Sequence, residues 1–254
     1  MGFRMHIRNF YRAVRIRLKR LRTGRTTAEE ATVISSCDGN RSCYVEFQSA
    51  WYILSWPETL DVPDLDRFPQ VVGGAVNYVK LSWKMGRTIR KSKRYNHGAD
   101  ASIRFTEGEE FPITKVAHPH PLARDRLRHE FKMLKEMSDR SLPVPKYDSE
   151  PLIDKEGIYG YRMQKLHPLD FEKTGQYLSQ AAAVLDKVHA MQFPIGDLHP
   201  GNVMLNDNGD IILIDLSYAG RLDHAIPSHI PGHVYGEARH FQSDGDQQRL
   251  KTYF

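Results

Sequence analysis

The sequence has no continuous apolar run of about 18 residues, so we expect no helix that spans a membrane. No apolar stretch follows the basic residues near its start, which argues against a secretory signal. Cysteine is scarce: Cys37 and Cys43 flank residues 38–40, and with no histidine nearby they are too few to bind a metal. The two thiols could close a small hairpin, but we expect a reduced pair in a cytoplasmic protein.

Acidic residues are in the minority, with 31 Asp and Glu against 36 Lys and Arg, which gives a formal net charge of +5. This excess favours anionic partners: nucleotides, phosphorylated glycans, anionic lipids or nucleic acids. The remaining composition, 40% hydrophobic and 26% charged, is that of a globular protein. A chain of 254 residues can bury a substantial core and suits one two-lobed domain with an extension.

The first 25 residues contain no acid, and their pattern predicts a basic amphipathic helix. One interpretation is that this helix docks on an anionic membrane surface, which would place the protein on the inner face of a membrane. The other is that it packs on its own domain with a solvated basic face, and periodicity does not separate the two. The apolar positions are Ile7, Phe10, Tyr11, Val14, Leu18 and Leu21, and the basic ones are Arg4, Arg8, Arg12, Arg15, Arg17, Lys19, Arg20, Arg22 and Arg25.

Two short motifs near the C-terminus carry the strongest functional signal. The first reads Gly-Asp-Leu-His-Pro-Gly-Asn and contains Asp197 and Asn202, and the second reads Ile-Leu-Ile-Asp-Leu-Ser and contains Asp215. Between them, the turn residues 206–210 and the apolar run 211–214 predict a β-hairpin. A hairpin returns the chain, so the residues at its two ends can lie side by side. Phosphoryl transfer needs such an arrangement of two carboxylates and an amide.

These motifs resemble the catalytic loop and metal site of the kinase superfamily. The resemblance is to small-molecule and atypical kinases such as aminoglycoside and choline kinases, and is closest to the bacterial lipopolysaccharide-core heptose kinases. It implies an α+β, two-lobed, protein-kinase-like fold with a reduced C-lobe, and activity that depends on ATP and Mg²⁺. It also implies that Asp197 is the catalytic base, and that Asn202 and Asp215 hold the metal.

The motifs differ from those of ordinary protein kinases at two positions. His199 occupies the place where protein kinases usually carry Lys or Arg, and the metal motif reads Asp-Leu-Ser, from Asp215 to Ser217, instead of Asp-Phe-Gly. No Ala-Pro-Glu motif follows. These departures argue against a protein kinase with a switchable activation loop.

The segment from about residue 88 onward matches the order of a kinase N-lobe. Gly98 lies in a predicted turn between strands, and Lys115 lies in the second of two further strands, which turn at residues 107–109. An ammonium group in an apolar strand needs a partner. Glu130, on a predicted helix over residues 124–137, is the natural one, and in kinases such a pair orients the Lys toward the phosphates. The alternative is that Glu130 pairs on its helix surface and Lys115 points to water.

A strand over residues 159–166 is expected to run into the hinge between the lobes. By the same resemblance, backbone groups near Gln164 and Leu166 would meet the adenine edge. Helices are predicted over residues 176–191 and 243–254, of which the first delivers the chain to the catalytic loop.

We therefore expect three segments: an N-terminal extension (1–70), an N-lobe (71–166) and a minimal C-lobe (167–254). The expected activity is transfer of phosphate to a hydroxyl of a glycan or glycolipid, such as a lipopolysaccharide-core sugar. A minimal protein kinase, for instance a secreted effector, and a pseudokinase binding module remain alternatives. Residues 77–94 are basic with interleaved aromatics, but without a recognised module we expect a solvated helix face or a glycan-phosphate contact and no specific nucleic acid.

Overall fold

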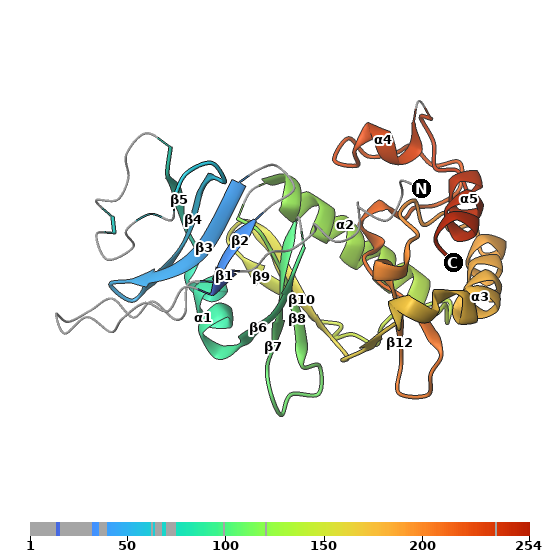
Figure 1. The fold of residues 1–254 in the computed structure, drawn as a ribbon, viewed down its shortest axis with the longest axis horizontal. Coiled ribbons are helices and arrows are strands. Elements are labelled where there is room, and N and C mark those ends of the chain that lie inside the picture. The colour runs from blue at the N-terminus through green and yellow to red at the C-terminus, as the bar shows by residue number, and fades with distance from the viewer. Residues whose placement is uncertain are drawn as a thin grey trace. The chain divides into compact units, whose positions relative to one another are not determined.

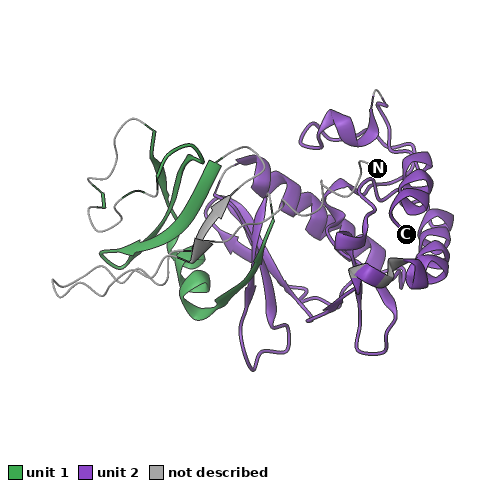
Figure 2. Cartoon of the chain, in the orientation of Figure 1, with its two compact units in different colours: residues 1–99 green, residues 100–254 purple. Residues whose placement is uncertain are grey.

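The chain forms two compact units, residues Met1–Ala99 and Asp100–Phe254, which are coloured separately in Figure 2. Its described residues hold several antiparallel sheets and five α-helices, which is compatible with the predicted α+β class. None of these helices is long and apolar enough to cross a membrane. The computed structural model describes residues 14–15, 32–35, 40–61, 63, 68–69, 75–98, 100–119, 121–236 and 238–254.

The first unit is built on an antiparallel sheet with the strand order β1-β2-β3-β4-β5. Strands β3 and β4 join through a tight turn at Gln48 and Ser49. Alternate side chains of this hairpin pack with Phe68 into a small apolar core that contains the buried free thiol of Cys43. The strands are β1 (Val14–Arg15), β2 (Thr32–Ser35), β3 (Asn40–Phe47), β4 (Ala50–Pro57) and β5 (Asn77–Lys80).

Helix α1 (Trp83–Lys91) follows the last strand of this sheet and is followed by β6 (Lys93–His97). It begins after Ser82, whose hydroxyl accepts the backbone N–H of Met85 at 3.2 Å and so caps the helix. Gly86 lies directly against Trp51 of β4, since a Cβ atom at this position would come within 3.0 Å of the indole. The close approach fixes α1 on the sheet.

Two features of the first unit differ from the sequence-based expectations. The predicted helix over residues 1–25 lies outside the described residues except for Val14 and Arg15, which pair with β2 as a strand and are not helical. The unit boundary after Ala99 falls inside the predicted N-lobe (71–166). The cause is that β5 pairs with β4, with Asn77 opposite Ser55. This pairing makes residues 77–80 part of the preceding sheet.

The second unit begins with an antiparallel sheet in which β7 (Ala101–Phe105), β8 (Ile113–Ala117), β10 (Gly157–Met163) and β9 (Leu152–Asp154) are neighbours in this order. The turn predicted between β7 and β8 is confirmed, with Gly108 at a φ of +80° that favours glycine. The predicted helix is also confirmed as α2 (Pro121–Ser138), which packs on β8 and β10 (Figure 1).

The remainder of the second unit contains the predicted hairpin. Strands β12 (Val203–Leu205) and β13 (Ile211–Leu213) pair antiparallel, and Gly209 takes a positive φ in the turn. The two predicted helices are confirmed as α3 and α5, except that α3 is preceded by a 3₁₀ turn. The elements are β11 (His167–Pro168), the 3₁₀ helix η2 (Phe171–Tyr177), α3 (Leu178–Ala190), η3 (Pro200–Asn202), η4 (Leu216–Tyr218), α4 (Gly232–Tyr235) and α5 (Asp244–Tyr253).

One apolar core connects these elements within the second unit. It includes Leu134 of α2, Leu185 of α3 and Leu213 of β13, each at most 2% exposed, together with residues of the sheet and of α5. Burying a leucine side chain completely contributes about 1.5–3 kcal/mol relative to leaving it in water. The helix α2, the sheet and the hairpin are therefore held in one packed body, and this body carries the polar residues described next.

Candidate active site

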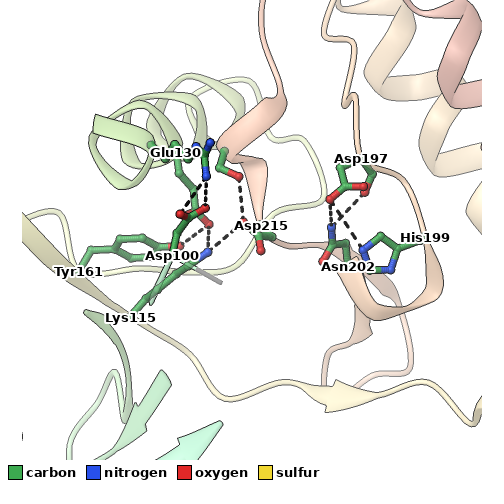
Figure 3. A network of polar contacts seen from close by, with 10 residues as sticks. Asp100, Lys115, Glu130, Tyr161, Asp197, His199, Asn202 and Asp215 are labelled. Atoms are coloured by element: carbon green, nitrogen blue, oxygen red, sulfur yellow. Dashed lines mark hydrogen bonds and ion pairs between the residues drawn. The ribbon is translucent and has the colours of Figure 1, made fainter. Parts of the chain in front are cut away.

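Lys115 lies at the centre of a buried ion-pair network (Figure 3). From strand β8, its Nζ contacts Glu130 Oε1 of α2 at 2.8 Å and Asp215 Oδ1, beyond β13, at 3.0 Å. The ion pair predicted between Lys115 and Glu130 is therefore present, and the alternative in which the ammonium points to water is wrong. The second carboxylate was not predicted as a partner of this ammonium.

Burial and charge oppose each other in this network. Burial lowers the pKa of Lys115, but the Asp215 and Glu130 carboxylates outweigh it and raise the pKa above its usual value, so the ammonium remains charged. Burial raises the pKa of Glu130, which is 2% exposed, and Lys115 opposes that shift. The hydroxyl of Tyr161 donates a further hydrogen bond to Glu130 Oε1 at 2.9 Å. Tyr161 is thus a supporting residue that the sequence motifs did not indicate.

Asp215 has an unusual backbone conformation, with φ 55° and ψ 59° in the left-handed region. Asp tolerates this region better than most residues, and strain of this kind is concentrated at functional sites. Its Oδ1 also accepts the hydroxyl of Ser217 at 3.1 Å. Burial raises the pKa of Asp215, but Lys115 and Ser217 outweigh burial and lower it. The side chain is 44% exposed, so an ionised carboxylate is accessible from solvent.

Asp197 and Asn202 contact each other across the catalytic-loop motif. The Asn202 side-chain amide donates to the backbone oxygen of Asp197 at 3.0 Å and to its Oδ2 at 3.3 Å. At the mouth of the hairpin, the Ile214 N–H donates to the backbone oxygen of Asn202 at 2.9 Å. This bond brings Asn202 beside the residue that precedes Asp215. The hairpin therefore returns the chain in the way that the motif spacing predicts.

His199 faces the carboxylate of Asp197. Its Nδ1 accepts the Gly201 N–H at 3.0 Å, so the neutral ring carries its proton on Nε2, which is 3.8 Å from Asp197 Oδ2. Burial raises the pKa of Asp197, His199 opposes that shift and the Asp215 carboxylate adds to it. A carboxylate with a raised pKa is better suited to accept a proton near neutral pH.

Asp246 of α5 holds the start of the Gly-Asp-Leu-His-Pro-Gly-Asn motif. It is fully buried and accepts the backbone N–H groups of Ile195 at 2.7 Å and Gly196 at 2.8 Å, while His189 Nε2 lies 3.0 Å away. Gly196 has a φ of +78°, and a Cβ atom there would lie 2.8 Å from the Tyr218 carbonyl oxygen, so this position requires glycine. Asp246 has no local sequence signal, because its backbone partners precede it by about fifty residues.

Helix α2, which carries Glu130, is anchored to the segment after Asp215. Arg126 binds both carboxylate oxygens of Asp100, at 2.9 and 2.8 Å, and its Nε donates to the backbone oxygen of His229 at 2.9 Å. His129 Nε2 donates to the Ala219 carbonyl at 2.7 Å, and its ring lies 5.0 Å from that of His229. Burial lowers the pKa of both histidines. Sequence patterns gave no indication of these contacts.

Gly98, Gln164 and Leu166 are the other residues predicted to contact the nucleotide. Gly98 follows β6 and belongs to the first unit, so its proximity to the phosphates stays a prediction. The segment with Gln164 and Leu166 lies between β10 and β11, as a hinge would. The Gln164 N–H donates to the Lys146 carbonyl at 2.9 Å, and the expected contact of backbone groups near Gln164 and Leu166 with an adenine edge stays a prediction. Leu166 is buried at 4% exposure.

The residues around Asp215 fit a magnesium–nucleotide complex. Carboxylate and carbonyl oxygens are the ligands that Mg²⁺ prefers. Because the Asn202 amide nitrogen faces Asp197, its carbonyl oxygen is the atom left to bind a cation beside Asp215. The part of the chain that the structure describes has no cluster of three or more His, Cys, Asp or Glu that could hold a metal alone. Phosphate oxygens and water would therefore complete the coordination, as is usual for Mg²⁺ with nucleotides.

No protein-family model matches this chain, and no curated protein matches it. A buried, charged Lys115 faces an accessible carboxylate, Asp215, while Asp197 lies on the other side of Asn202 (Figure 3). Such an arrangement can bind an anionic group and its metal cation beside Lys115 and Asp215. It can also bind a hydroxyl group beside Asp197.

Proposed function

We propose that the chain is an ATP- and Mg²⁺-dependent phosphotransferase with a two-lobed, protein-kinase-like fold that acts on a hydroxyl acceptor. The observation that carries the proposal is the contact of Lys115 with both Glu130 and Asp215, since it combines a phosphate-binding cation and a metal-binding carboxylate. The contact between Asn202 and Asp197 supports it, because phosphoryl transfer needs a carboxylate that orients the attacking hydroxyl next to a metal-binding amide.

Each residue has a distinct role in this proposal. Lys115 binds the α- and β-phosphates of ATP, and Glu130 with Tyr161 holds the ammonium in position. Asn202 and Asp215 hold Mg²⁺, which neutralises the charge that develops on the phosphates.

Asp197 orients the acceptor hydroxyl and takes its proton as the oxygen attacks the γ-phosphorus. A new P–O bond forms to the acceptor, the bond from the γ-phosphorus to the bridging β-phosphate oxygen breaks, and ADP leaves. The raised pKa of Asp197 supports this role, since it makes the carboxylate a stronger base.

The proposed acceptor is a glycan or glycolipid, such as a lipopolysaccharide-core sugar. This choice rests on the motif resemblance and on His199, which stands where protein kinases carry Lys or Arg. A protein acceptor is the alternative. A pseudokinase without activity is disfavoured, because all five nominal catalytic residues are present. Location in the cytoplasm, with residues 1–25 on an anionic membrane face, belongs to the same proposal. Apart from Val14 and Arg15, these residues lie outside the part of the chain that the structure describes.

Titration calorimetry with ATP, with and without Mg²⁺, tests the nucleotide site. We expect the wild-type protein to bind ATP more tightly with Mg²⁺, and Asp215→Asn to lose this dependence. Asp207→Asn is the matched control, because Asp207 lies in the hairpin turn and its side chain is 90% exposed. ATP binding that is absent in the wild type, or unaffected by Mg²⁺, would contradict the proposal.

A further inference from the structure

Helix α1 in the first unit has two faces of opposite character. Met85, Gly86 and Ile89 are buried and turn toward Trp51 and the sheet. The opposite arc of the helix is exposed to solvent. It consists of Trp83, Lys84, Arg87, Arg90 and Lys91, and we call these five residues the α1 surface.

The α1 surface lies in a segment without acidic residues. From Asn77 to Arg94 the sequence has no Asp or Glu, and it has seven Lys or Arg: Lys80, Lys84, Arg87, Arg90, Lys91, Lys93 and Arg94. The ion pair of Arg90 with Glu46 of β3 ties one end of the α1 surface to the sheet. Lys84, Arg87 and Lys91 supply the remaining positive charge of the α1 surface, and this charge is complementary to an anionic partner.

Trp83 is the most exposed large apolar side chain on the described surface, at 72%. The guanidinium of Arg87 lies 5.5 Å from the centre of its ring. Val79 of the edge strand β5 is 46% exposed, and it pairs with Ile53, which shares a sheet face with Trp51 and thus with α1. The exposed indole lies beside the cations of α1. Indole rings prefer the boundary between headgroups and acyl chains, and cations prefer the anionic headgroups.

We propose that the α1 surface docks the protein on an anionic lipid bilayer, with Trp83 at the level of the headgroups and the cations of α1 on lipid phosphates and carboxylates. The inference does not depend on phosphotransfer, and it concerns residues other than the N-terminal segment 1–25. A nucleic acid is the less suitable occupant, because Arg87 covers one face of the indole on which a base would stack.

The three tryptophans of the chain give this proposal a specific readout. Trp51 and Trp56 are 4% and 1% exposed, so their emission already reflects a buried environment. Trp83 alone of the three is in water. When the full chain is mixed with phosphatidylcholine vesicles that contain phosphatidylserine, we expect a blue shift of the emission and protection from an aqueous quencher. Vesicles of phosphatidylcholine alone should produce neither change.

Co-sedimentation of the full chain with the same vesicles measures how much the basic residues of α1 contribute to vesicle binding. A basic residue at an anionic membrane contributes about fivefold to the partition coefficient, from about 1 kcal/mol each. Lys84→Gln with Arg87→Gln should therefore weaken binding about 25-fold. The matched control is Lys132→Gln with Lys135→Gln, which removes the same charge from exposed positions of α2. This control should lose little binding.

Trp83→Phe separates docking from a non-specific charge effect. It should abolish the fluorescence change while the protein still sediments with anionic vesicles. The proposal is overturned if the wild type binds these vesicles without any change in tryptophan emission, or if Lys84→Gln with Arg87→Gln binds as well as the control. It is also overturned if the full chain does not bind the anionic vesicles. Binding of an oligonucleotide that these two substitutions weaken would then assign the α1 surface to a nucleic acid.

Discussion

Lys115 and Asp215 are one hundred residues apart in the sequence, yet Nζ of Lys115 lies 3.0 Å from Oδ1 of Asp215. This contact connects β8 to a residue that follows the hairpin of β12 and β13. It has a functional consequence under the proposed activity, because the cation that binds phosphate and the carboxylate that binds Mg²⁺ hold each other in position. Glu130 supplies the second negative charge, so the buried ammonium is compensated before any nucleotide arrives.

Replacing Lys115 should impair catalysis. Lys115→Met removes a charge that positions the phosphates, and we expect kcat/KM to fall by at least about tenfold. Glu130→Gln should act in the same direction but more weakly, because the ammonium keeps Asp215 as a partner. Steady-state kinetics with Lys132→Met, an exposed lysine of α2, provides the control. Activity of both variants at the wild-type level would show that another lysine serves the nucleotide.

Replacing Asp197 and replacing Asp215 should impair different steps, transfer in the first case and both nucleotide binding and transfer in the second. Asp197→Ala should abolish transfer and largely retain Mg²⁺–ATP binding, because the proposed role of Asp197 is to orient the acceptor hydroxyl. Asp215→Ala should lose both transfer and tight Mg²⁺-dependent binding, because its carboxylate faces Lys115 and the proposed metal. Parallel measurements of nucleotide affinity and turnover separate the two. Full turnover by either variant would refute the assignment.

Asp246 should be required for stability and for the position of the catalytic loop. Asp246→Asn leaves one oxygen for two backbone N–H groups in a fully buried place, so at least one donor loses its acceptor. We expect the free energy of unfolding to fall by about 2 kcal/mol and kcat to fall with it. The control is Asp244→Asn, an exposed residue of the same helix, which should change stability by less than about 0.5 kcal/mol. Equal denaturant midpoints for both variants would contradict this role.

The contact between α2 and the segment after Asp215 should weaken in acid. Burial lowers the pKa of His129 and His229 in the folded state, so the unfolded chain binds more protons below the ordinary histidine value of 6.5. The free energy of unfolding should therefore decrease as pH falls through about 6.5, until the lower folded-state pKa values are reached.

Thermal melts between about pH 7.5 and about pH 5.5 measure this effect. His129→Gln keeps a donor for the Ala219 carbonyl but cannot be protonated, so its melting temperature should fall less with acid than that of the wild type. His233→Gln, at an exposed position of α4, should follow the wild type. The same pH dependence in wild type and His129→Gln would show that His129 does not contribute.

Features with a local sequence pattern were predicted correctly. The hairpin of β12 and β13 has a turn between two apolar runs, and α2 has helical periodicity. The pair of Lys115 with Glu130 followed from the cost of an unpaired ammonium in an apolar strand. Each of these depends on a segment short enough for its pattern to appear in the sequence.

Features that depend on distant contacts were not predicted. Asp246 and Tyr161 look like ordinary helix and strand residues until the fold brings them to Ile195 and Glu130. The boundary after Ala99 depends on the pairing of β5 with β4, which are about twenty residues apart in the sequence, and no local pattern reveals this pairing.

The most direct test is transfer of label from ATP radiolabelled at its γ-phosphate, in the presence of Mg²⁺, to purified glycolipid and, separately, to a mixed protein lysate. The account predicts that the wild type labels the glycolipid, that Asp197→Ala labels neither, and that Asp207→Ala, altered at an exposed hairpin aspartate, retains activity. Labelling of the lysate alone would keep phosphotransfer but change the acceptor class. Absence of transfer to any hydroxyl acceptor by the purified wild type, or equal transfer by Asp197→Ala, would contradict the central claim.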